Sequence, residues 1–324
     1  MTAPPWISVV IPTYQGERFL TQALESIAEQ WDDTIEVIAI DDGSTDSTLT
    51  ILKRYEAQLQ LRIFAHEHTG NWVKNTNRAL NEARGTYVCM LHQDDLWLPS
   101  RIAALRKAMK QNPGAGMYLN PSLFVDKNGK TVGPWSIPLP TNRPLASHEV
   151  LPHLMVQNFI ALPAPVFRRD LWQTVDTMDD SLWFLADWKL WGALIAKTTT
   201  VVIPEAITAF RLHAASQTIG RTHDANDLRI QYQTVITAIA NSLKKGSTRT
   251  QAIRAAELNT ELCIAMALWS HRARREAMST LVQLREWRID VWIKCIRDSR
   301  VRERITARLR AGLHARTPHR DNTP

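Results

Sequence analysis

Short apolar runs alternate with amphipathic segments through the first third of the chain. The apolar runs are rich in β-branched residues and predict buried strands over residues 7–11, 35–40, 61–65 and 86–91. Between them, apolar residues recur every three or four positions and predict helices over residues 19–31, 49–55 and 71–83. Strands that alternate with helices predict an α/β fold with a mostly parallel sheet flanked by helices.

The turns between these elements carry weaker signals. Ser44 or Thr45 is expected to cap the second helix. Beyond Pro113, the sequence Asp126–Gly129 between two apolar runs predicts a hairpin turn. The prolines between Pro134 and Pro144 predict either a loop over the site or a simple connector. Later apolar segments predict a strand within residues 160–167, a helix over residues 188–196 and a last strand over residues 201–203.

The last third of the chain has few glycines and prolines, and its helical periodicity is interspersed with arginines. We therefore expect a catalytic domain over residues 1–220 and a basic helical extension over residues 221–324. The net charge of +7 belongs to this extension, because residues from Asn241 onward carry 18 Lys and Arg against 8 Asp and Glu. Its tryptophans and arginines favour the surface of an anionic membrane, although packing on the catalytic domain or on a second subunit explains the pattern almost equally well. No nucleic-acid-binding motif accompanies the arginines.

Location and redox state follow from two further patterns. No apolar run approaches the roughly 18 to 20 residues of a membrane-spanning helix, and Met1–Trp6 lacks the basic start and apolar stretch of a secretory signal. We expect a cytoplasmic protein, with peripheral attachment to the inner face of the cell membrane as the variant that the extension suggests. Three scattered cysteines predict reduced, mostly buried thiols.

Acidic residues follow two of the predicted strands. Asp41–Ser44 comes after the second strand and Gln93–Asp95 after the fourth, where open α/β sheets bind ligands. Each cluster alone also suits a turn or a helix cap. Carboxylates gathered at one sheet edge repel each other unless a cation lies between them, so Mg²⁺ or Mn²⁺ with a diphosphate ligand is expected. The chain lacks the glycine-rich dinucleotide fingerprint, the Walker loop and the Gly-x-Ser-x-Gly elbow, which argues against three other enzyme classes.

Three ordered segments carry a resemblance to a known family. Residues 7–14 (Ile-Ser-Val-Val-Ile-Pro-Thr-Tyr), 41–46 (Asp-Asp-Gly-Ser-Thr-Asp) and 93–99 (Gln-Asp-Asp-Leu-Trp-Leu-Pro) resemble the signatures of family-two inverting glycosyltransferases of the GT-A fold. The resemblance covers roughly residues 6–217. Residues 70–80 and the Gln-Asp-Asp-Leu-Trp run that ends at Trp97 are similar to a subgroup that transfers rhamnose and related sugars in bacterial surface polysaccharide assembly.

The resemblance implies a nucleotide site. Pro12 and Tyr14 would line the base pocket, and Asp42 would accept a hydrogen bond from a pyrimidine base. Lys74 would balance phosphate charge, although an ordinary solvated helix lysine is the better explanation of that residue. The partner so implied is a nucleotide-sugar donor.

The resemblance also implies a metal site. Asp94 would hold a divalent metal that bridges the phosphates, while Asp95 would either assist or only shape the turn. In the closing segment, His213 would approach the metal or a phosphate, against an equal expectation of ordinary packing, and Arg211 would order the loop. His92 departs from the pattern, because the family often has an acid there, and this departure puts metal affinity in doubt.

The general base implied by the resemblance is Asp187, which precedes a Trp-rich helix. It would take the proton from an acceptor hydroxyl in a single inverting displacement, and its alternative role is a helix cap. Ala186 departs from the family, which often has an acid there. We therefore expect transfer of a sugar from a UDP- or dTDP-sugar to a glycan or lipid-linked acceptor; the alternative is a catalytically weak homologue that serves as a nucleotide-binding or scaffolding component. Sugar, linkage and oligomeric state stay open.

The sequence His66–His68 contains two histidines around a glutamate. A zinc site would need a third ligand nearby, and none is evident in the sequence. An ordinary surface segment is the better interpretation.

Overall fold

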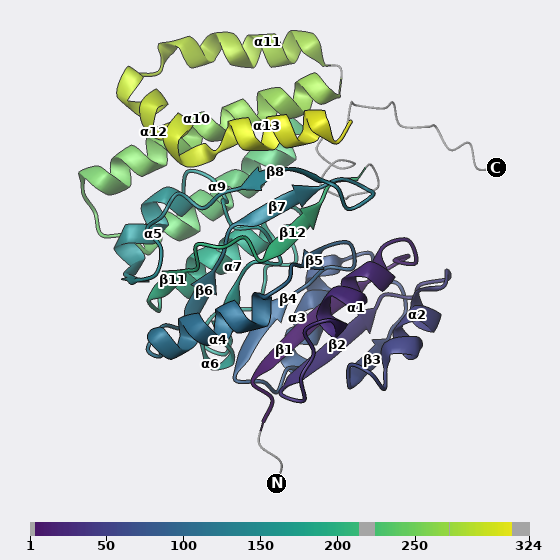
Figure 1. The fold of residues 1–324 in the computed structure, drawn as a ribbon. Helices are drawn as coiled ribbons and strands as arrows, with labels where there is room; N and C mark the ends of the chain where they lie inside the picture. The colour runs from purple at the N-terminus through teal and green to yellow at the C-terminus, as the bar shows by residue number, and fades with distance from the viewer. Residues whose placement is uncertain (1–3, 214–223, 272, 313–324) are drawn as a thin grey trace, which may run out of the picture.

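The main sheet lies at the centre of the catalytic part. The computed structural model describes residues 4–213, 224–271 and 273–312. Its eight-stranded sheet has the order β3-β2-β1-β4-β10-β6-β11-β9 (Figure 1). The strands are β1 (Ile7–Thr13), β2 (Ile35–Asp41), β3 (Leu61–Ala65), β4 (Tyr87–Met90), β6 (Met117–Leu119), β9 (Pro144–Leu145), β10 (Val166–Arg168) and β11 (Thr200–Val202).

The sheet is parallel through its N-terminal half and mixed beyond β4. β1 pairs in parallel with β2 and β4, and β2 with β3. β10 is antiparallel to both of its neighbours, and β9 is antiparallel to β11. The predicted α/β fold with a mostly parallel sheet is confirmed, and the parallel register brings the carboxyl ends of β1, β2 and β4 to the same edge.

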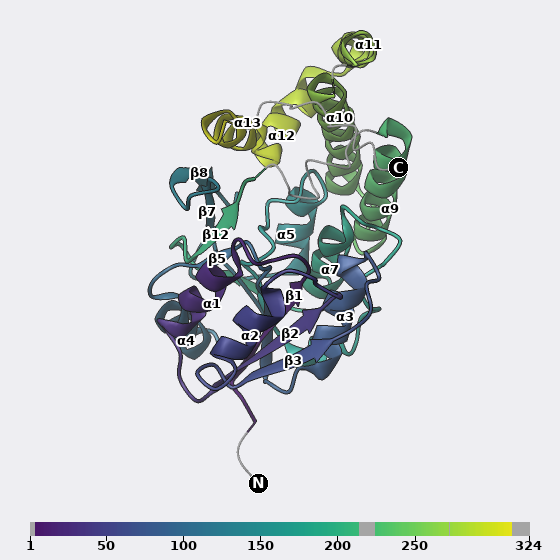
Figure 2. The same cartoon turned by 90° about the vertical axis from the view of Figure 1, so that its right-hand side faces the viewer.

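Helices cover both faces of this sheet. α1 (Leu20–Ala28), α2 (Thr48–Tyr55) and α4 (Arg101–Gln111) lie on one side, and the other side carries α3 (Trp72–Glu82), α5 (Ser147–Leu154), α6 (Arg169–Trp172) and α7 (Ala186–Ile195) (Figure 2). Val9 of β1 packs into the first layer and its neighbour Val10 into the second. Because alternate side chains of a strand point to opposite faces, a sheet covered on both sides requires the continuous apolar runs seen in the sequence.

A second sheet extends the catalytic part. β5 (Leu96–Trp97), β12 (Thr208–Arg211), β7 (Ser122–Val125) and β8 (Thr131–Trp135) form a four-stranded sheet in the order β5-β12-β7-β8. The predicted hairpin at residues 126–129 joins β7 to β8, which pair antiparallel. The expectation that residues 201–203 form the last strand was wrong, because β12 follows and pairs with β7. This pairing needs a partner 86 residues away, which no local pattern encodes.

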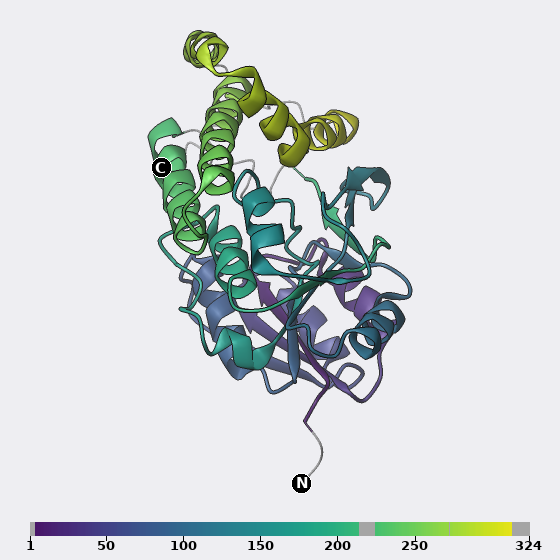
Figure 3. The ribbon, with the colours of Figure 1, turned by 90° about the vertical axis from the view of Figure 1, so that its left-hand side faces the viewer.

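Helices make up the described part of the C-terminal region, as expected. They are α9 (Ala225–Asn241), α10 (Ser247–Ser270), α11 (Arg274–Gln283), the 3₁₀ turn η1 (Leu284–Glu286), α12 (Ile289–Ser299) and α13 (Val301–Arg310). α9 and α10 run side by side along the catalytic part (Figure 3), and Tyr232 and Val235 of α9 belong to the same hydrophobic core as α7. The expected boundary at residues 220 and 221 lies outside the described residues.

One local expectation was wrong, and another was confirmed only in part. The N-cap of α2 is Ser47, not Ser44 or Thr45, because the Ser44 hydroxyl donates instead to Asp41 Oδ1 at 2.6 Å. The segment 160–167 is mostly loop, and β10 covers only Val166–Arg168. In both places a contact within the turn or between strands outweighs the local sequence preference.

The cysteine and membrane expectations have simple outcomes. All three cysteines are free, with Cys89 and Cys295 buried and Cys263 partly buried. Within residues 4–213, 224–271 and 273–312, no helix combines the length and the apolar character that crossing a membrane requires.

Candidate active site

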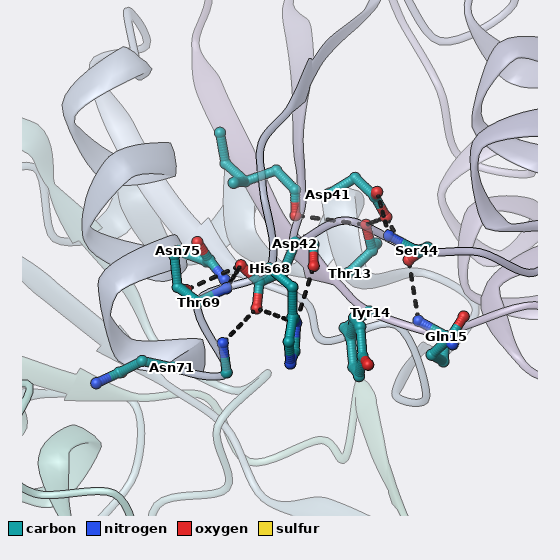
Figure 4. Close-up of polar contacts among 12 residues, drawn as sticks. Thr13, Tyr14, Gln15, Asp41, Asp42, Ser44, His68, Thr69, Asn71 and Asn75 are labelled. Carbon is teal, nitrogen blue, oxygen red and sulfur yellow. Dashed lines mark hydrogen bonds and ion pairs between the residues drawn. The ribbon is translucent and has the colours of Figure 1, made fainter.

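The ends of β1 and β2 form the first half of the site. Thr13 pairs with Asp41 in register, and the Asp42 amide donates to the Thr13 carbonyl at 2.9 Å. The Asp41 carboxylate accepts hydrogen bonds from the Thr13 hydroxyl at 3.0 Å and from the Ser44 amide at 2.9 Å (Figure 4). Asp41 is therefore used to build the turn, and Asp42 is the acid of this pair that faces the following loop.

Asp42 is buried and is surrounded by donors from the loop after β3. Its carboxylate accepts from the Thr69 amide at 2.9 Å, the Thr69 hydroxyl at 2.8 Å and the Gly70 amide at 3.0 Å. Burial alone would raise the pKa of Asp42, but the hydrogen bonds from Thr69, Asn75 and Gly70 outweigh it, and the pKa is lowered. This carboxylate is held ionised and fixed in orientation.

An aromatic pair lies next to Asp42. The rings of Tyr14 and His68 stack with centroids 4.2 Å apart, and His68 Nδ1 is 3.1 Å from Asp42 Oδ2 (Figure 4). Tyr14 is 40% exposed, so the pair has an open aromatic surface. Gly43 must be glycine here, because its φ is +75° and a Cβ would lie 2.9 Å from the His68 amide nitrogen. An aromatic surface beside an ionised carboxylate is suited to binding a planar base that carries an N–H group.

Pro12 and Lys74 are the other two residues that the resemblance assigns to the nucleotide site. Pro12 is buried inside β1 opposite Ile40, so it supports the strand below Tyr14. The Lys74 ammonium is 3.6 Å from Asp180 Oδ2, with about half of each side chain exposed. The expected role of Lys74 toward a phosphate stays a prediction.

Gln93 connects the first half of the site to the end of β4. Its side chain accepts from the Tyr14 amide at 2.8 Å and donates to the Tyr14 carbonyl at 2.9 Å. Gly16 gives it room, because a Cβ there would lie 2.5 Å from Gln93 Oε1. The segment 92–95 after β4 is thus tied to the Tyr14 backbone.

Asp94 and His213 form the centre of the second half. Asp94 Oδ2 lies 2.8 Å from His213 Nε2, and the histidine side chain is 9% exposed. Burial opposes ionisation of Asp94, but the hydrogen bond from His213 and the nearby His92 and His213 charges outweigh it and lower its pKa. A carboxylate oxygen and an imidazole nitrogen are both ligands that Mn²⁺ accepts. Among the described residues, no group of three or more His, Cys, Asp or Glu side chains gathers as a complete metal cage.

Asp95 and Arg211 brace this half. The Asp95 carboxylate is buried and accepts from the Arg211 amide at 3.0 Å, while Arg211 Nε donates to the Asp94 carbonyl at 2.8 Å. Arg211 Nη2 also donates to Gln22 Oε1 at 2.8 Å. Burial and the charge of Asp94 raise the pKa of Asp95 well above its usual value. These contacts favour the alternative in which Asp95 shapes the turn. Arg211 binds β12 to the segment that contains Asp94 and Asp95.

His92 and Trp97 are packed into the structure around the acids. The His92 ring meets Trp72 edge to face with centroids 5.2 Å apart, and burial lowers the pKa of His92 despite the charge of Asp94. Trp97 is 2% exposed and lies in β5, with the Arg101 guanidinium 5.3 Å from its ring centroid. Trp97 therefore supports the segment from inside.

Asp187 lies in the first turn of α7, whose N-cap is Leu185. The alternative that Asp187 is the N-cap of this helix is therefore wrong. Asn158 Nδ2, from the loop after α5, donates to Asp187 Oδ2 at 3.0 Å. Burial raises the pKa of Asp187 to about 6, although hydrogen bonds from Trp188 and Asn158 act in the other direction. A carboxylate with this pKa is ionised at neutral pH and is also a usable proton acceptor.

Residues 8–162 match the family model described as glycosyl transferase family 2. The chain is a glycosyltransferase, and its residues 8–162 resemble a family 2 domain. A protein from Haemophilus influenzae named an uncharacterized glycosyltransferase is 23% identical over 235 residues, which are 69% of this chain and 70% of that protein.

Two further proteins are similar to this glycosyltransferase. Staphylococcus aureus TarS, a poly(ribitol-phosphate) beta-N-acetylglucosaminyltransferase, is 40% identical over 91 residues, which are 27% of this chain and 16% of TarS. The structure of TarS residues 1–349 with UDP-GlcNAc superposes with a TM-score of 0.67 at 18% identity, covering 86% of this chain and 79% of that one. The mannosyltransferase PcManGT from Pyrobaculum calidifontis, solved with GDP-Man and Mn²⁺, gives a TM-score of 0.56 at 18% identity, covering 96% and 88%. At such identities the likeness shows the GT-A fold alone.

Three contributors to the glycosyltransferase site were missed by sequence reasoning. Gln93 was seen within a signature but given no role, and His68 was assigned to an ordinary surface segment. Asn158 carries no pattern of its own, and only its contact with Asp187 reveals it. The position of His68 two residues before the Gly70-Asn71 segment was the one signal available for it.

Proposed function

We propose that this glycosyltransferase moves a sugar from a UDP- or dTDP-sugar to a hydroxyl of a glycan or lipid-linked acceptor in surface polysaccharide assembly, with inversion at the anomeric carbon. The supporting observation is that Gln93 ties the Tyr14–Asp42 surface to the Asp94–His213 pair. A nucleobase surface beside a diphosphate-binding acid and histidine is the arrangement that a nucleotide-sugar donor needs. The TarS structures with UDP-GlcNAc and with UDP support a uridine nucleotide as the first one to test.

The donor base lies against Tyr14 and His68. An N–H group of the base donates to the Asp42 carboxylate, which the loop amides hold in place and keep ionised. Asp42 cannot rotate without breaking those bonds, so a base without an N–H at this position forms one hydrogen bond fewer with the carboxylate. This gives the site its preference for a pyrimidine with a protonated ring nitrogen.

Asp94 and His213 would hold a divalent metal, Mn²⁺ or Mg²⁺. When bound, the metal supplies positive charge that stabilises the departing diphosphate. Two protein ligands leave the remaining coordination positions to the donor phosphates and water, as is common for Mg²⁺ and Mn²⁺ sites. The Mn²⁺ in the PcManGT structure supports this assignment.

Asp187 is the general base. Its pKa of about 6 leaves it ionised at pH 7 and basic enough to accept the proton of the attacking hydroxyl. The oxygen so activated forms the new glycosidic bond as the bond to the diphosphate breaks. One displacement of this kind inverts the anomeric centre.

The C-terminal helices bring the enzyme to the cytoplasmic face of a membrane that carries its acceptor. Ile289, Ile293 and Ile296 share one face of α12 and are 75%, 60% and 48% exposed. Arg285 and Arg288 lie directly before this face in the sequence. An exposed apolar stripe beside arginines suits an anionic lipid surface.

Calorimetric titration tests the donor assignment. UDP and dTDP are titrated with and without Mn²⁺ into the wild type, Asp94→Ala and the control Asp33→Ala, which removes an exposed acid of the loop between α1 and β2. Metal-dependent binding that is lost in Asp94→Ala alone supports the site. If neither nucleotide binds, the donor assignment is overturned. If a nucleotide binds but no sugar of a donor panel is transferred, the alternative is favoured, in which the protein is a nucleotide-binding or scaffolding component.

A further inference from the structure

α13 is docked on the second sheet of the catalytic part. Ala307 is fully buried, and a Cβ placed on Gly133 of β8 would lie 3.7 Å from the Ala307 side chain. Glu303 Oε2 accepts from the Ser136 amide at 2.9 Å, and Arg310 Nη1 donates to the Val132 carbonyl at 3.2 Å. The end of the described chain is therefore fixed along β8 (Figure 1).

Arg304 points from α13 toward the loop after α5. Its guanidinium lies 5.0 Å from the ring centroid of Trp135 and contacts the side chain of Gln157. Arg304 Nη2 donates to the Asn158 carbonyl oxygen. A partly buried cation of this kind is held by the aromatic face and by the backbone carbonyl.

Asn158 joins Arg304 to Asp187. Its carbonyl oxygen accepts from Arg304, while its side-chain Nδ2 donates to Asp187 Oδ2 at 3.0 Å. Its Oδ1 accepts from the Ile160 amide at 3.1 Å, so the amide side chain is oriented from both ends. The positive charge of Arg304 also favours the ionised form of Asp187, although burial has the larger effect and raises the pKa of Asp187.

A second contact fastens the same region to the C-terminal helices. Asp298 of α12 is completely buried and lies 3.2 Å from His153 Nδ1 of α5. It also accepts from Lys294 at 2.9 Å and from Arg297 at 2.8 Å. α5 and the loop that follows it are thus held by α12 and α13 together.

We propose that Arg304 is a positioning residue for Asp187: it fixes the loop at Asn158, and so the C-terminal helices complete the acceptor side of the active site. This inference rests on the assignment of Asp187 as the general base. Donor binding depends on the other half of the site, so removal of the guanidinium changes the chemical step and leaves nucleotide affinity unchanged.

Arg304→Met tests the proposal, with Arg304→Lys as the variant that retains the charge. Arg302→Met is the matched control, because Arg302 is an exposed arginine of the same helix. The first measurement is the titration of Asp187 by carboxyl-carbon NMR of aspartate-labelled protein, with the signal assigned through Asp187→Asn. We expect the pKa of Asp187 to rise by roughly one unit in Arg304→Met, to recover in Arg304→Lys and to stay at the wild-type value in Arg302→Met.

Other groups also contribute to this titration, and the variants leave them in place except for Asn158, whose hydrogen bond to Asp187 weakens when the loop is released. Asp187 receives hydrogen bonds from the Trp188 amide and the Asn158 side chain. Arg304 itself faces Tyr232, Cys263 and Arg308, and burial is the main influence that lowers its pKa. An unchanged Asp187 titration in Arg304→Met overturns the proposal.

Hydrogen–deuterium exchange and kinetics complete the test. Peptides that cover residues 155–160 are expected to exchange at least tenfold faster in Arg304→Met than in Arg302→Met. In Arg304→Met, the rate of sugar transfer, measured as the formation of free UDP from a donor that the wild type uses, should fall at least tenfold. The Kd of this variant for UDP with Mn²⁺ should stay within twofold of the wild-type value. Loss of UDP binding in Arg304→Met would show a general structural role and overturn the proposal. If Asp187→Asn keeps wild-type turnover, the base assignment fails, and the exchange and titration data still decide whether Arg304 fixes the loop.

Discussion

Replacement of Asp187 by Asn is expected to stabilise the protein at neutral pH while it removes the base. Burial raises the pKa of Asp187 from 3.8 to about 6, so the folded protein binds this proton more tightly than the unfolded chain does. As the pH rises from about 4 to about 6, the wild type therefore loses stability that the Asn variant keeps. Above that window the difference between the two proteins is constant.

The magnitude follows from the size of the shift. Each pKa unit corresponds to about 1.4 kcal/mol, so a shift of about two units sets an upper limit of ~3 kcal/mol. The Asp187 side chain is only partly buried, and water at its exposed edge reduces this value. We expect Asp187→Asn to raise the free energy of unfolding at pH 8 by about 1 to 2 kcal/mol.

Thermal unfolding without ligands measures this effect. The Tm difference between Asp187→Asn and the wild type should be near zero at about pH 4 and reach a few degrees at about pH 8. Asp298→Asn is the control of opposite sign, because His153, Lys294 and Arg297 outweigh burial and lower the pKa of Asp298. That variant should lose stability at pH 8. An Asp187→Asn protein that is less stable than the wild type at pH 8, or equally shifted at both pH values, would refute the reasoning.

Three further predictions concern binding and turnover. The kcat of the wild type should fall about tenfold per pH unit below about pH 6. Asp187→Asn should lower kcat at pH 7.5 by about 10²- to 10⁴-fold without weakening UDP binding. If the pH profile of kcat is the same in Asp187→Asn as in the wild type, Asp187 is not the base. His213→Ala should remove the Mn²⁺ dependence of UDP affinity in calorimetry, and retention of that dependence would exclude His213 as a ligand. Tyr14→Ala should weaken UDP binding by about 1 to 3 kcal/mol through loss of stacking, whereas Tyr14→Phe should bind as the wild type does; equal losses in both would point to the hydroxyl instead.

The sequence pattern of the C-terminal region has two explanations, and the fold shows that its helices differ in what they contact. The charge and periodicity of residues 241–324 suit both a membrane surface and packing on the catalytic part. In the structure, α13 packs on β8 through the buried Ala307, while Ile289 and Ile293 of α12 stay exposed. Packing on the catalytic part therefore explains α13, and the membrane surface stays a proposal for α12, because an amphipathic helix shows which residues share a face but not what that face meets.

The sequence by itself determined the elements that depend on local chemistry. β-branched runs such as Ile35–Asp41 must be buried on both sides, and Asp126–Gly129 forms the predicted turn because its residues bond within the turn. The order of strands and helices was enough to bring the ends of β1, β2 and β4 to one edge, and with them Asp42 and Asp94. These outcomes follow from side-chain alternation, which operates over a few residues at a time, and from the succession of strands and helices along the chain, which favours a parallel sheet.

Only the tertiary structure decided how the acidic side chains are used. Asp94 and Asp95 are neighbours in sequence, yet one meets His213 and the other the Arg211 amide, because β12 crosses the turn between them. Asp187 gains its raised pKa from burial under elements that lie far from it in sequence, and Arg304 reaches Asn158 across 146 residues. A pKa and a hydrogen bond between distant segments depend on packing geometry in three dimensions, and that geometry is set by the whole fold and not by any local pattern.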